Sequence, residues 1–270
     1  MRYLELAGRA PSAFAGWEEF RDTLAAQRDD VARFMAEQGI QTNEVRRSWF
    51  LLPAFLFVAR TARVETFDVV ELGPSAGFNL VWDRYRYRYV GGAWGAKNAP
   101  LDLTGVERRP VPADLLDVKV VVRDRIGLDL SPRDVTQDDD LLLLKAFVWV
   151  GQEERLEQID RAAAALRADA PRLVRGDYIE LLPRLLAHRR EGALTVVFQT
   201  ASAGYLTGDQ RQTLRTALDD AGRESPLGWV STVPPLDREL RAFAVEAGVL
   251  PGEPSRLMHA DFHGAWLEWL

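Results

Sequence analysis

Short apolar runs rich in β-branched residues alternate with helical stretches along most of this chain, and this alternation restricts its fold more than any other feature. Each run ends in a turn or an acidic residue, and strands separated by helices in this way form a sheet covered on both faces. The last two runs are joined by a short turn, so the final strand is antiparallel. We expect a doubly wound, Rossmann-like α/β sheet with seven strands, at residues 67–72, 125–130, 172–175, 194–199, 228–233, 256–261 and 265–270.

The first 64 residues have a different pattern, typical of helices. Apolar residues recur at helical spacing over 15–39, and Thr42 or Asn43 can cap a second helix that runs to about residue 63. We interpret residues 1–64 as an N-terminal helical cap and residues 65–270 as one α/β domain. Helices are expected between its strands, the last of them at 236–247.

A β excursion is expected as an insertion at about residues 84–123, between the first two strands of the sheet. Tyrosine and arginine alternate with a period of two over 84–89, and residues 118–122 have the composition of a further strand. The alternation also resembles a basic and aromatic surface for nucleic acid, but the acidic surroundings favour an amphipathic strand.

Composition and charge exclude several classes of function. The chain has 34 basic and 40 acidic residues, a net charge of −6, which disfavours binding to nucleic acid and to anionic membranes. Because it has no cysteine, it has no disulfide, thiolate nucleophile or zinc-thiolate site. The longest apolar run, residues 49–59, is shorter than the roughly 20 residues of a membrane span, and no secretory signal is visible. We expect a cytoplasmic protein, of an oligomeric state that the sequence does not indicate.

The segment from Glu71 to Asn79 follows the first expected strand and carries the strongest functional signal. Its small residues allow a sharp turn and a close approach of backbone to ligand. A pyrophosphate suits this loop poorly, because Pro74 has no N–H and Glu71 adds a negative charge. A ligand with a cationic or zwitterionic end fits it better.

The pattern Glu71-x-Gly73-x-Ser75-x-Gly77 resembles the first motif of class I methyltransferases, which implies S-adenosylmethionine as cofactor. The resemblance implies that Asp129, at the end of the second strand, holds the ribose and that Asp177, after the third strand, faces the adenine. Two departures are the 58 residues between Glu71 and Asp129 and the absence of an acidic or Asn-Pro-Pro motif at Gln199. The expected cofactor-binding residues are Glu71, Gly73, Ser75, Gly77, Asn79, Asp129, Gly176, Asp177 and Gln199.

Longer segments resemble a bacterial family catalogued as domain of unknown function 2332, which implies no established activity. They are Thr42–Arg47, Glu71–Leu80 with Asp83-Arg84-Tyr85, Gly127–Pro132, Arg175–Asp177 and His263–Trp266.

The methyltransferase hypothesis predicts a small-molecule acceptor, with Tyr205 and His263 as candidate catalytic residues. Residues at the start of the second helix, Asn43, Glu44 and Arg47, either contact the substrate as part of a lid or only pack. Two alternatives stay open: a non-catalytic cofactor-binding module, and an esterase-like hydrolase. In the hydrolase, Ser75 of Gly73-Pro74-Ser75-Ala76-Gly77 is the nucleophile, with His263 and either Asp237 or Asp261 as partners. His259, Asp261 and His263 alternate, but the turn at Gly264 argues against a metal site, and we expect none.

Overall fold

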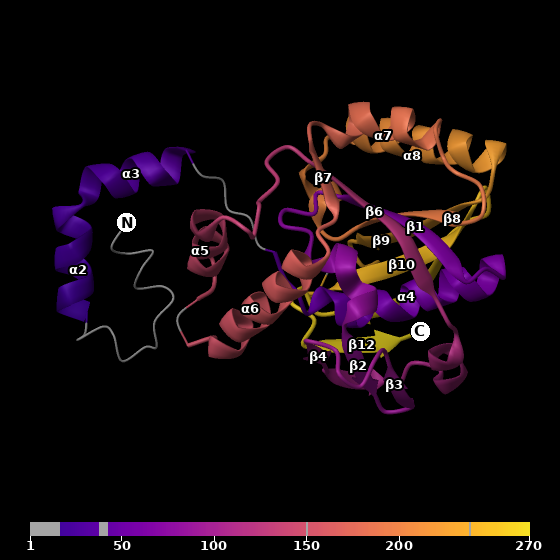
Figure 1. The fold of residues 1–270 in the computed structure, drawn as a ribbon, viewed down its shortest axis with the longest axis horizontal. Helices are drawn as coiled ribbons and strands as arrows, with labels where there is room; N and C mark the ends of the chain where they lie inside the picture. The colour runs from indigo at the N-terminus through magenta and orange to yellow at the C-terminus, as the bar shows by residue number, and fades with distance from the viewer. Residues whose placement is uncertain (1–16, 38–42, 150, 238) are drawn as a thin grey trace.

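The computed structural model describes residues 17–37, 43–149, 151–237 and 239–270 (Figure 1). Its largest feature is a mostly parallel sheet of nine strands, in the order β5-β12-β11-β10-β9-β8-β1-β6-β7. Five of them form a continuous parallel group in the order β7-β6-β1-β8-β9. These five are β1 (Thr66–Leu72), β6 (Val121–Asp129), β7 (Arg172–Arg175), β8 (Leu194–Gln199) and β9 (Leu227–Val233). The mixed α/β class expected from the sequence is confirmed.

The expected number of strands is wrong, because the four strands beyond β9 include two that the sequence did not predict. The other two correspond to the strands expected at 256–261 and 265–270. An antiparallel meander forms β10 (Phe243–Leu250), β11 (Ser255–Ala260) and β12 (Trp266–Trp269). The edge strand β5 (Val106–Arg109) pairs parallel to β12 and comes from the inserted excursion. The sheet therefore combines a parallel half with an antiparallel half, which differs from the expected seven strands.

The helix expected at 236–247 is wrong, since this region contains β10 from Phe243 onward. Both α4 and α8 pack against β10, so side chains on its two faces are buried and the alternation of a half-exposed strand is absent. The strand expected at 118–122 is also wrong as a separate element, because residues 121–129 form one continuous strand, β6.

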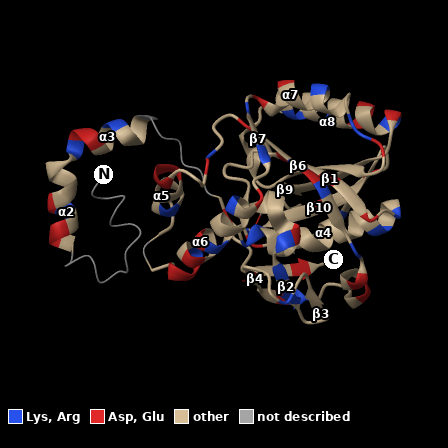
Figure 2. Cartoon of the chain, viewed as in Figure 1, with Lys and Arg blue, Asp and Glu red and all other residues tan. Residues whose placement is uncertain are grey.

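Helices cover both faces of the sheet. One face carries α4 (Arg47–Ala62) and α6 (Glu153–Ala168), and the other carries α7 (Tyr178–Leu186) and α8 (Gly208–Glu224) (Figure 1). Neighbouring residues of β1 show the two layers, because Val69 belongs to the core under α4 whereas Val70 belongs to the core under α7 and α8. Figure 2 shows charges of both signs along α7 and α8, as expected for helices with one face in water.

The second expected helix begins at Arg47, a few residues after Asn43, and Thr42 lies outside the described residues. Its residues Trp49, Phe50 and Phe55 are fully buried, so α4 belongs to the main core. The helix expected at 15–39 is instead two helices within the described range, α2 (Trp17–Ala26) and α3 (Arg28–Glu37), which stand to one side of the body (Figure 1).

The excursion contains a small sheet of β2 (Arg86–Tyr89), β3 (Gly92–Trp94) and β4 (Asp102–Leu103), besides β5. Its expected amphipathic strand is confirmed, because Tyr85, Tyr87 and Tyr89 are buried. Their hydroxyls donate to backbone carbonyls of residues 78, 82 and 49. Each buried hydroxyl thus has a partner, which removes the cost of leaving it without one. The remaining elements are η2 (Phe78–Arg84), η3 (Ala113–Asp117), α5 (Asp138–Ala146) and η4 (Ser202–Tyr205).

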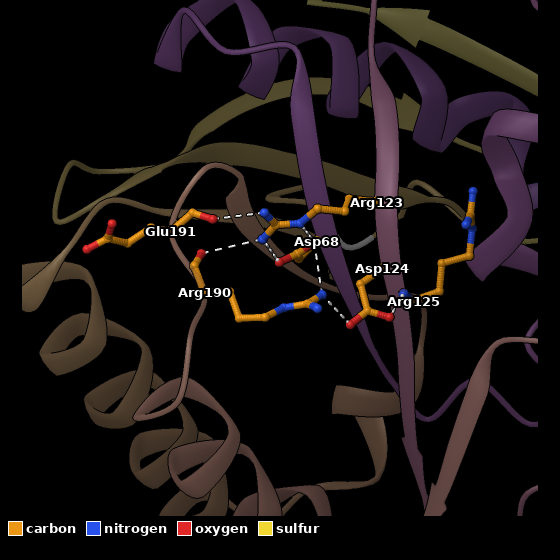
Figure 3. A network of polar contacts seen from close by, with 6 residues as sticks. All are labelled: Asp68, Arg123, Asp124, Arg125, Arg190 and Glu191. Atoms are coloured by element: carbon orange, nitrogen blue, oxygen red, sulfur yellow. Dashed lines mark hydrogen bonds and ion pairs between the residues drawn. The ribbon is translucent and has the colours of Figure 1, made fainter.

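A polar network holds the segment between α7 and β8 against the sheet (Figure 3). Arg123 of β6 donates to Asp68 of β1 and to the carbonyl of Glu191, and Arg190 pairs with Asp124 at 2.6 Å. These contacts lie in the first halves of β1 and β6, away from the carboxyl ends of the strands. We interpret this network as structural.

Candidate functional site

A cavity of about 440 Å³ opens at the carboxyl ends of β1, β6, β7 and β8. In an open α/β sheet the ligand crevice forms where successive crossovers diverge, and here the chain runs from β1 to β6 and β7 on one side, then to β8 and β9 on the other. The size suits a small molecule. The residues that line the cavity are Asn43, Arg47, Glu71, Gly73, Pro74, Ser75, Asn79, Asp129, Leu130, Asp177, Tyr178, Thr200, Ala201, Ser202, Tyr205, Leu206, Gln210 and His263.

The loop after β1 is held in a sharp turn by backbone conformations that favour glycine. Gly73, Ser75 and Gly77 have φ of 74°, 53° and 83°. A Cβ atom on Gly73 would lie 2.6 Å from the Cβ of Ser202, so the loop after β8 packs directly on this turn. Asn43 adds a side-chain hydrogen bond to the carbonyl of Pro74 at 3.1 Å. The sequence pattern of small residues therefore corresponds to a tight turn beside the cavity.

Two of the expected ligand carboxylates also stabilise the local backbone. Asp129 accepts hydrogen bonds from the amides of Ser75 and Ser131, both at 2.8 Å. Asp177 caps α7 by accepting from the amide of Ile179 at 2.8 Å. Both carboxylates nevertheless line the cavity. A carboxylate has about four acceptor sites, so each can still accept hydrogen bonds from a ligand.

Glu71 is the carboxylate most perturbed by its surroundings. It lies at the end of β1, is 2% exposed, and has one buried oxygen, Oε2, without a hydrogen-bond partner among the described residues. Burial raises the pKa of Glu71 to about 8, with a further rise from Asp129 and an opposing effect of Arg47. A cationic group in the cavity would satisfy the free oxygen and favour the ionised carboxylate.

Arg47 is the buried cation of the cavity. It is the first residue of α4, and its side-chain Nε donates to the carbonyl of Phe262 at 3.0 Å. Its guanidinium carbon lies 5.7 Å from the centre of the Phe243 ring, within range of a cation–π contact. Burial lowers the pKa of Arg47, whereas Glu44 and Glu71 raise it. An arginine stays protonated under such conditions, so the cavity contains a positive charge.

His263 joins the cavity from the turn between β11 and β12. Its Nδ1 lies 3.4 Å from Oε2 of Glu44, and the same buried oxygen pairs with Arg155 of α6 at 2.7 Å. The two acids that we considered as partners of Ser75 and His263 are not among the lining residues. Asp261 accepts from the amides of His263 and Ala265, and Asp237 accepts from the amide of Glu239.

Ten of the residues expected from the sequence meet in this cavity: Asn43, Arg47, Glu71, Gly73, Ser75, Asn79, Asp129, Asp177, Tyr205 and His263. Tyr205 is 87% exposed, which places it at the rim. Four expected residues are not among the lining residues: Glu44, Gly77, Gly176 and Gln199. The side chain of Gln199 is buried and donates to the carbonyl of Thr232, and Glu44 lies behind the lining residue His263, with Oε2 3.4 Å from its Nδ1.

Several lining residues escaped the sequence analysis, including Leu130, Tyr178 and the segment 200–202. A signal for 200–202 was present, because these residues directly follow β8 and the carboxyl ends of parallel strands face the crevice. No comparable signal identifies Gln210, which comes from the first turn of α8.

The described residues contain no group of three or more His, Cys, Asp and Glu side chains that could hold a metal ion. Within the same ranges, no helix has the length and hydropathy that crossing a bilayer requires.

A comparison with curated proteins gives no match. The family described as "Uncharacterized protein conserved in bacteria (DUF2332)" matches residues 2–269, nearly the whole chain. The chain therefore belongs to this family of uncharacterised bacterial proteins.

Proposed function

We propose that this protein binds S-adenosylmethionine in the cavity and methylates a small-molecule acceptor. The observation that carries the proposal is the convergence of three acidic side chains, Glu71, Asp129 and Asp177, from the ends of the three consecutive strands β1, β6 and β7. They meet where the parallel strand order favours a ligand crevice. The resemblance of the Glu71–Gly77 loop to the first methyltransferase motif supports the same ligand.

The residues present fit this cofactor in charge. Oε2 of Glu71 is buried and has no hydrogen-bond partner among the described residues, so it suits an ammonium or sulfonium group of a ligand. A basic cavity would repel such a group. Asp129 would accept from ribose hydroxyls and Asp177 from the adenine amine. The bound cofactor supplies an electrophilic methyl group.

The chain's own part in the transfer is to orient the acceptor, exclude water and take up a proton. In this proposal a proton on Nδ1 of His263 faces Oε2 of Glu44, 3.4 Å away, and Nε2 is the ring nitrogen that accepts the proton of the acceptor. Glu44 then acts as a positioning residue, because it sets the tautomer and stabilises the imidazolium that forms. Tyr205 lines the rim of the cavity, and in this proposal it contacts the acceptor.

The direct test is isothermal titration calorimetry with S-adenosylmethionine and S-adenosylhomocysteine. We expect Asp129→Asn to weaken binding on the order of ten- to a hundredfold, because charge-assisted hydrogen bonds are worth roughly 1.5–3 kcal/mol. Asp124→Asn is the matched control, since Asp124 lies on the same strand β6 and is not among the lining residues. Absence of binding to the wild-type protein would refute the proposal. Binding without methylation of any acceptor in a broad screen would instead favour the non-catalytic module.

A second candidate, an esterase-like hydrolase, is favoured by one observation. Ser75 has a φ of 53° directly after a strand, as a nucleophile on a strained turn does, and it shares the cavity with His263. This function predicts that a fluorophosphonate labels Ser75 and that Ser75→Ala abolishes both labelling and ester turnover. Unchanged labelling in the variant would exclude Ser75 as the nucleophile.

A further inference from the structure

We infer that Arg47 binds a carboxylate of the methyl acceptor, so that the substrate of this site is an anionic small molecule. This inference rests on the proposed function, because it divides the cavity between a cofactor and an acceptor. It adds a class of substrate to that function, and it depends on the position and partners of Arg47.

The first step is that the guanidinium is buried and makes no direct ion pair within the part of the chain that the structure describes. Arg47 is 8% exposed, and the only hydrogen bond of its side chain among the described residues is the one from Nε to the carbonyl of Phe262. No carboxylate of the described residues lies within ion-pair distance of it. A guanidinium has five N–H donors, so four remain for a ligand. A buried cation with unused donors is costly in an empty site and favourable beside an anion.

The second step is that Arg47 enters the cavity from a different element than Asp129 and Asp177. These two acids come from the carboxyl end of β6 and from the residues after β7, whereas Arg47 comes from α4 and His263 from the turn between β11 and β12. A ligand carboxylate beside Asp129 or Asp177 would be repelled, so it is favoured beside the guanidinium of Arg47.

The third step connects Arg47 to the proposed base. Its Nε is bonded to the carbonyl of Phe262, the residue that immediately precedes His263. The Phe243 ring lies against the guanidinium and packs edge-on to the Phe262 ring at 4.7 Å, which restricts the orientation of Arg47. A molecule held by the free edge of Arg47 therefore lies next to His263. This position suits the acceptor, whose proton His263 takes.

The test uses trifluoroacetate as a minimal carboxylate probe, observed by fluorine NMR with the full chain saturated with S-adenosylhomocysteine. We expect saturable binding to the wild-type protein and a loss of at least about tenfold in Arg47→Met, as for removal of one charge-assisted pair. Arg47→Lys should lose less affinity for trifluoroacetate than Arg47→Met, because lysine keeps the positive charge but lacks the paired donors of the guanidinium. Trifluoroacetamide, the neutral counterpart, should bind at least about tenfold more weakly than trifluoroacetate.

Arg60→Met is the matched control, because Arg60 lies on the same helix but pairs with Asp114 at the surface. Trifluoroacetate affinity should be unchanged in this variant. Equal affinity in the wild-type protein and in folded Arg47→Lys and Arg47→Met variants would overturn the inference, as would equal binding of the neutral amide. Thermal melts of each variant confirm that a loss of binding is not a loss of folding.

A further arm separates the acceptor from the cofactor as the source of the carboxylate. If Arg47→Met weakens S-adenosylhomocysteine but leaves 5′-methylthioadenosine unchanged, Arg47 holds the carboxylate of the cofactor, and the inference is overturned while the proposed function stands. If S-adenosylhomocysteine binds neither the wild-type protein nor any variant, the proposed function fails. Trifluoroacetate titration of the ligand-free protein then still reports whether Arg47 is an anion receptor.

Discussion

The buried carboxyl of Glu71 makes the stability of the protein depend on pH, and Glu71→Gln should remove this dependence. In the folded state burial raises the pKa of Glu71 from 4.5 to about 8. Below pH 4.5 the carboxyl is protonated in both states, so its contribution to stability is fully present. As the pH rises, the unfolded chain ionises first and stability falls until the folded carboxyl also ionises near pH 8.

The magnitude follows from the size of the pKa shift. Each pKa unit corresponds to about 1.4 kcal/mol, so a shift from 4.5 to about 8 costs on the order of 5 kcal/mol across this range. At pH 7 the accumulated cost is roughly 3 kcal/mol. We therefore expect Glu71→Gln to be more stable than the wild type at pH 7, with a melting temperature higher by roughly 6–12 °C.

The assay is chemical denaturation of both proteins at a series of pH values between 5 and 8. The quantity to follow is the difference in free energy of unfolding between variant and wild type, because the titration of all other groups largely cancels in it. This difference should grow steadily with pH. Glu180→Gln, on the exposed side of α7, should show no such growth. A constant difference for Glu71→Gln would refute the reasoning that burial perturbs this carboxyl.

Three further substitutions test the loop after β1 and two buried polar contacts of the core. Gly73→Ala should destabilise the protein by about 1–3 kcal/mol, since φ is 74° and the new Cβ would meet Ser202 at 2.6 Å; thermal melting measures this, and an unchanged melting temperature would contradict it. Tyr85→Phe should cost about 1 kcal/mol in urea denaturation, because a buried hydroxyl that donates to a carbonyl at 2.8 Å is lost; a stabilised variant would argue against that bond. Asp83→Asn should lower the free energy of unfolding by about 3 kcal/mol in the same assay, because the mostly buried Arg125, 2.5 Å away, loses its counter-ion. This loss of stability should disappear when Arg125 is also replaced by Met.

The sequence predicted the parallel half of the sheet well, because its signals are local. The strand expected at 67–72 is Thr66–Leu72, and those expected at 172–175 and 194–199 have those bounds in the structure. Runs of β-branched residues ended by turns depend only on neighbours along the chain. The residue pattern alone also predicts the ligand crevice for the same reason. The small residues of the Gly73–Gly77 loop and the acids that follow strands both lie at the carboxyl ends of strands, where such a crevice forms.

In the antiparallel half the sequence located β11 and β12, expected at 256–261 and 265–270, but it missed β10 and β5, because their patterns depend on which elements cover them or pair with them. Helices on both faces give β10 a burial pattern that resembles a helix, and β5 becomes part of the main sheet only through pairing with β12, far along the chain. Local periodicity carries no information about such long-range partners.

What the sequence by itself determined is the α/β class, the tight loop after the first strand and most of the side chains that meet at the carboxyl edge. Only the tertiary structure decided their electrostatic state. It buried Glu71 with one oxygen that has no partner among the described residues, left Arg47 without a direct ion pair to a carboxylate in those residues, and placed Glu44 beside His263 from the other end of the chain. The physical reason is that solvation and Coulomb interactions depend on distances in space, which are set by packing between segments remote in sequence.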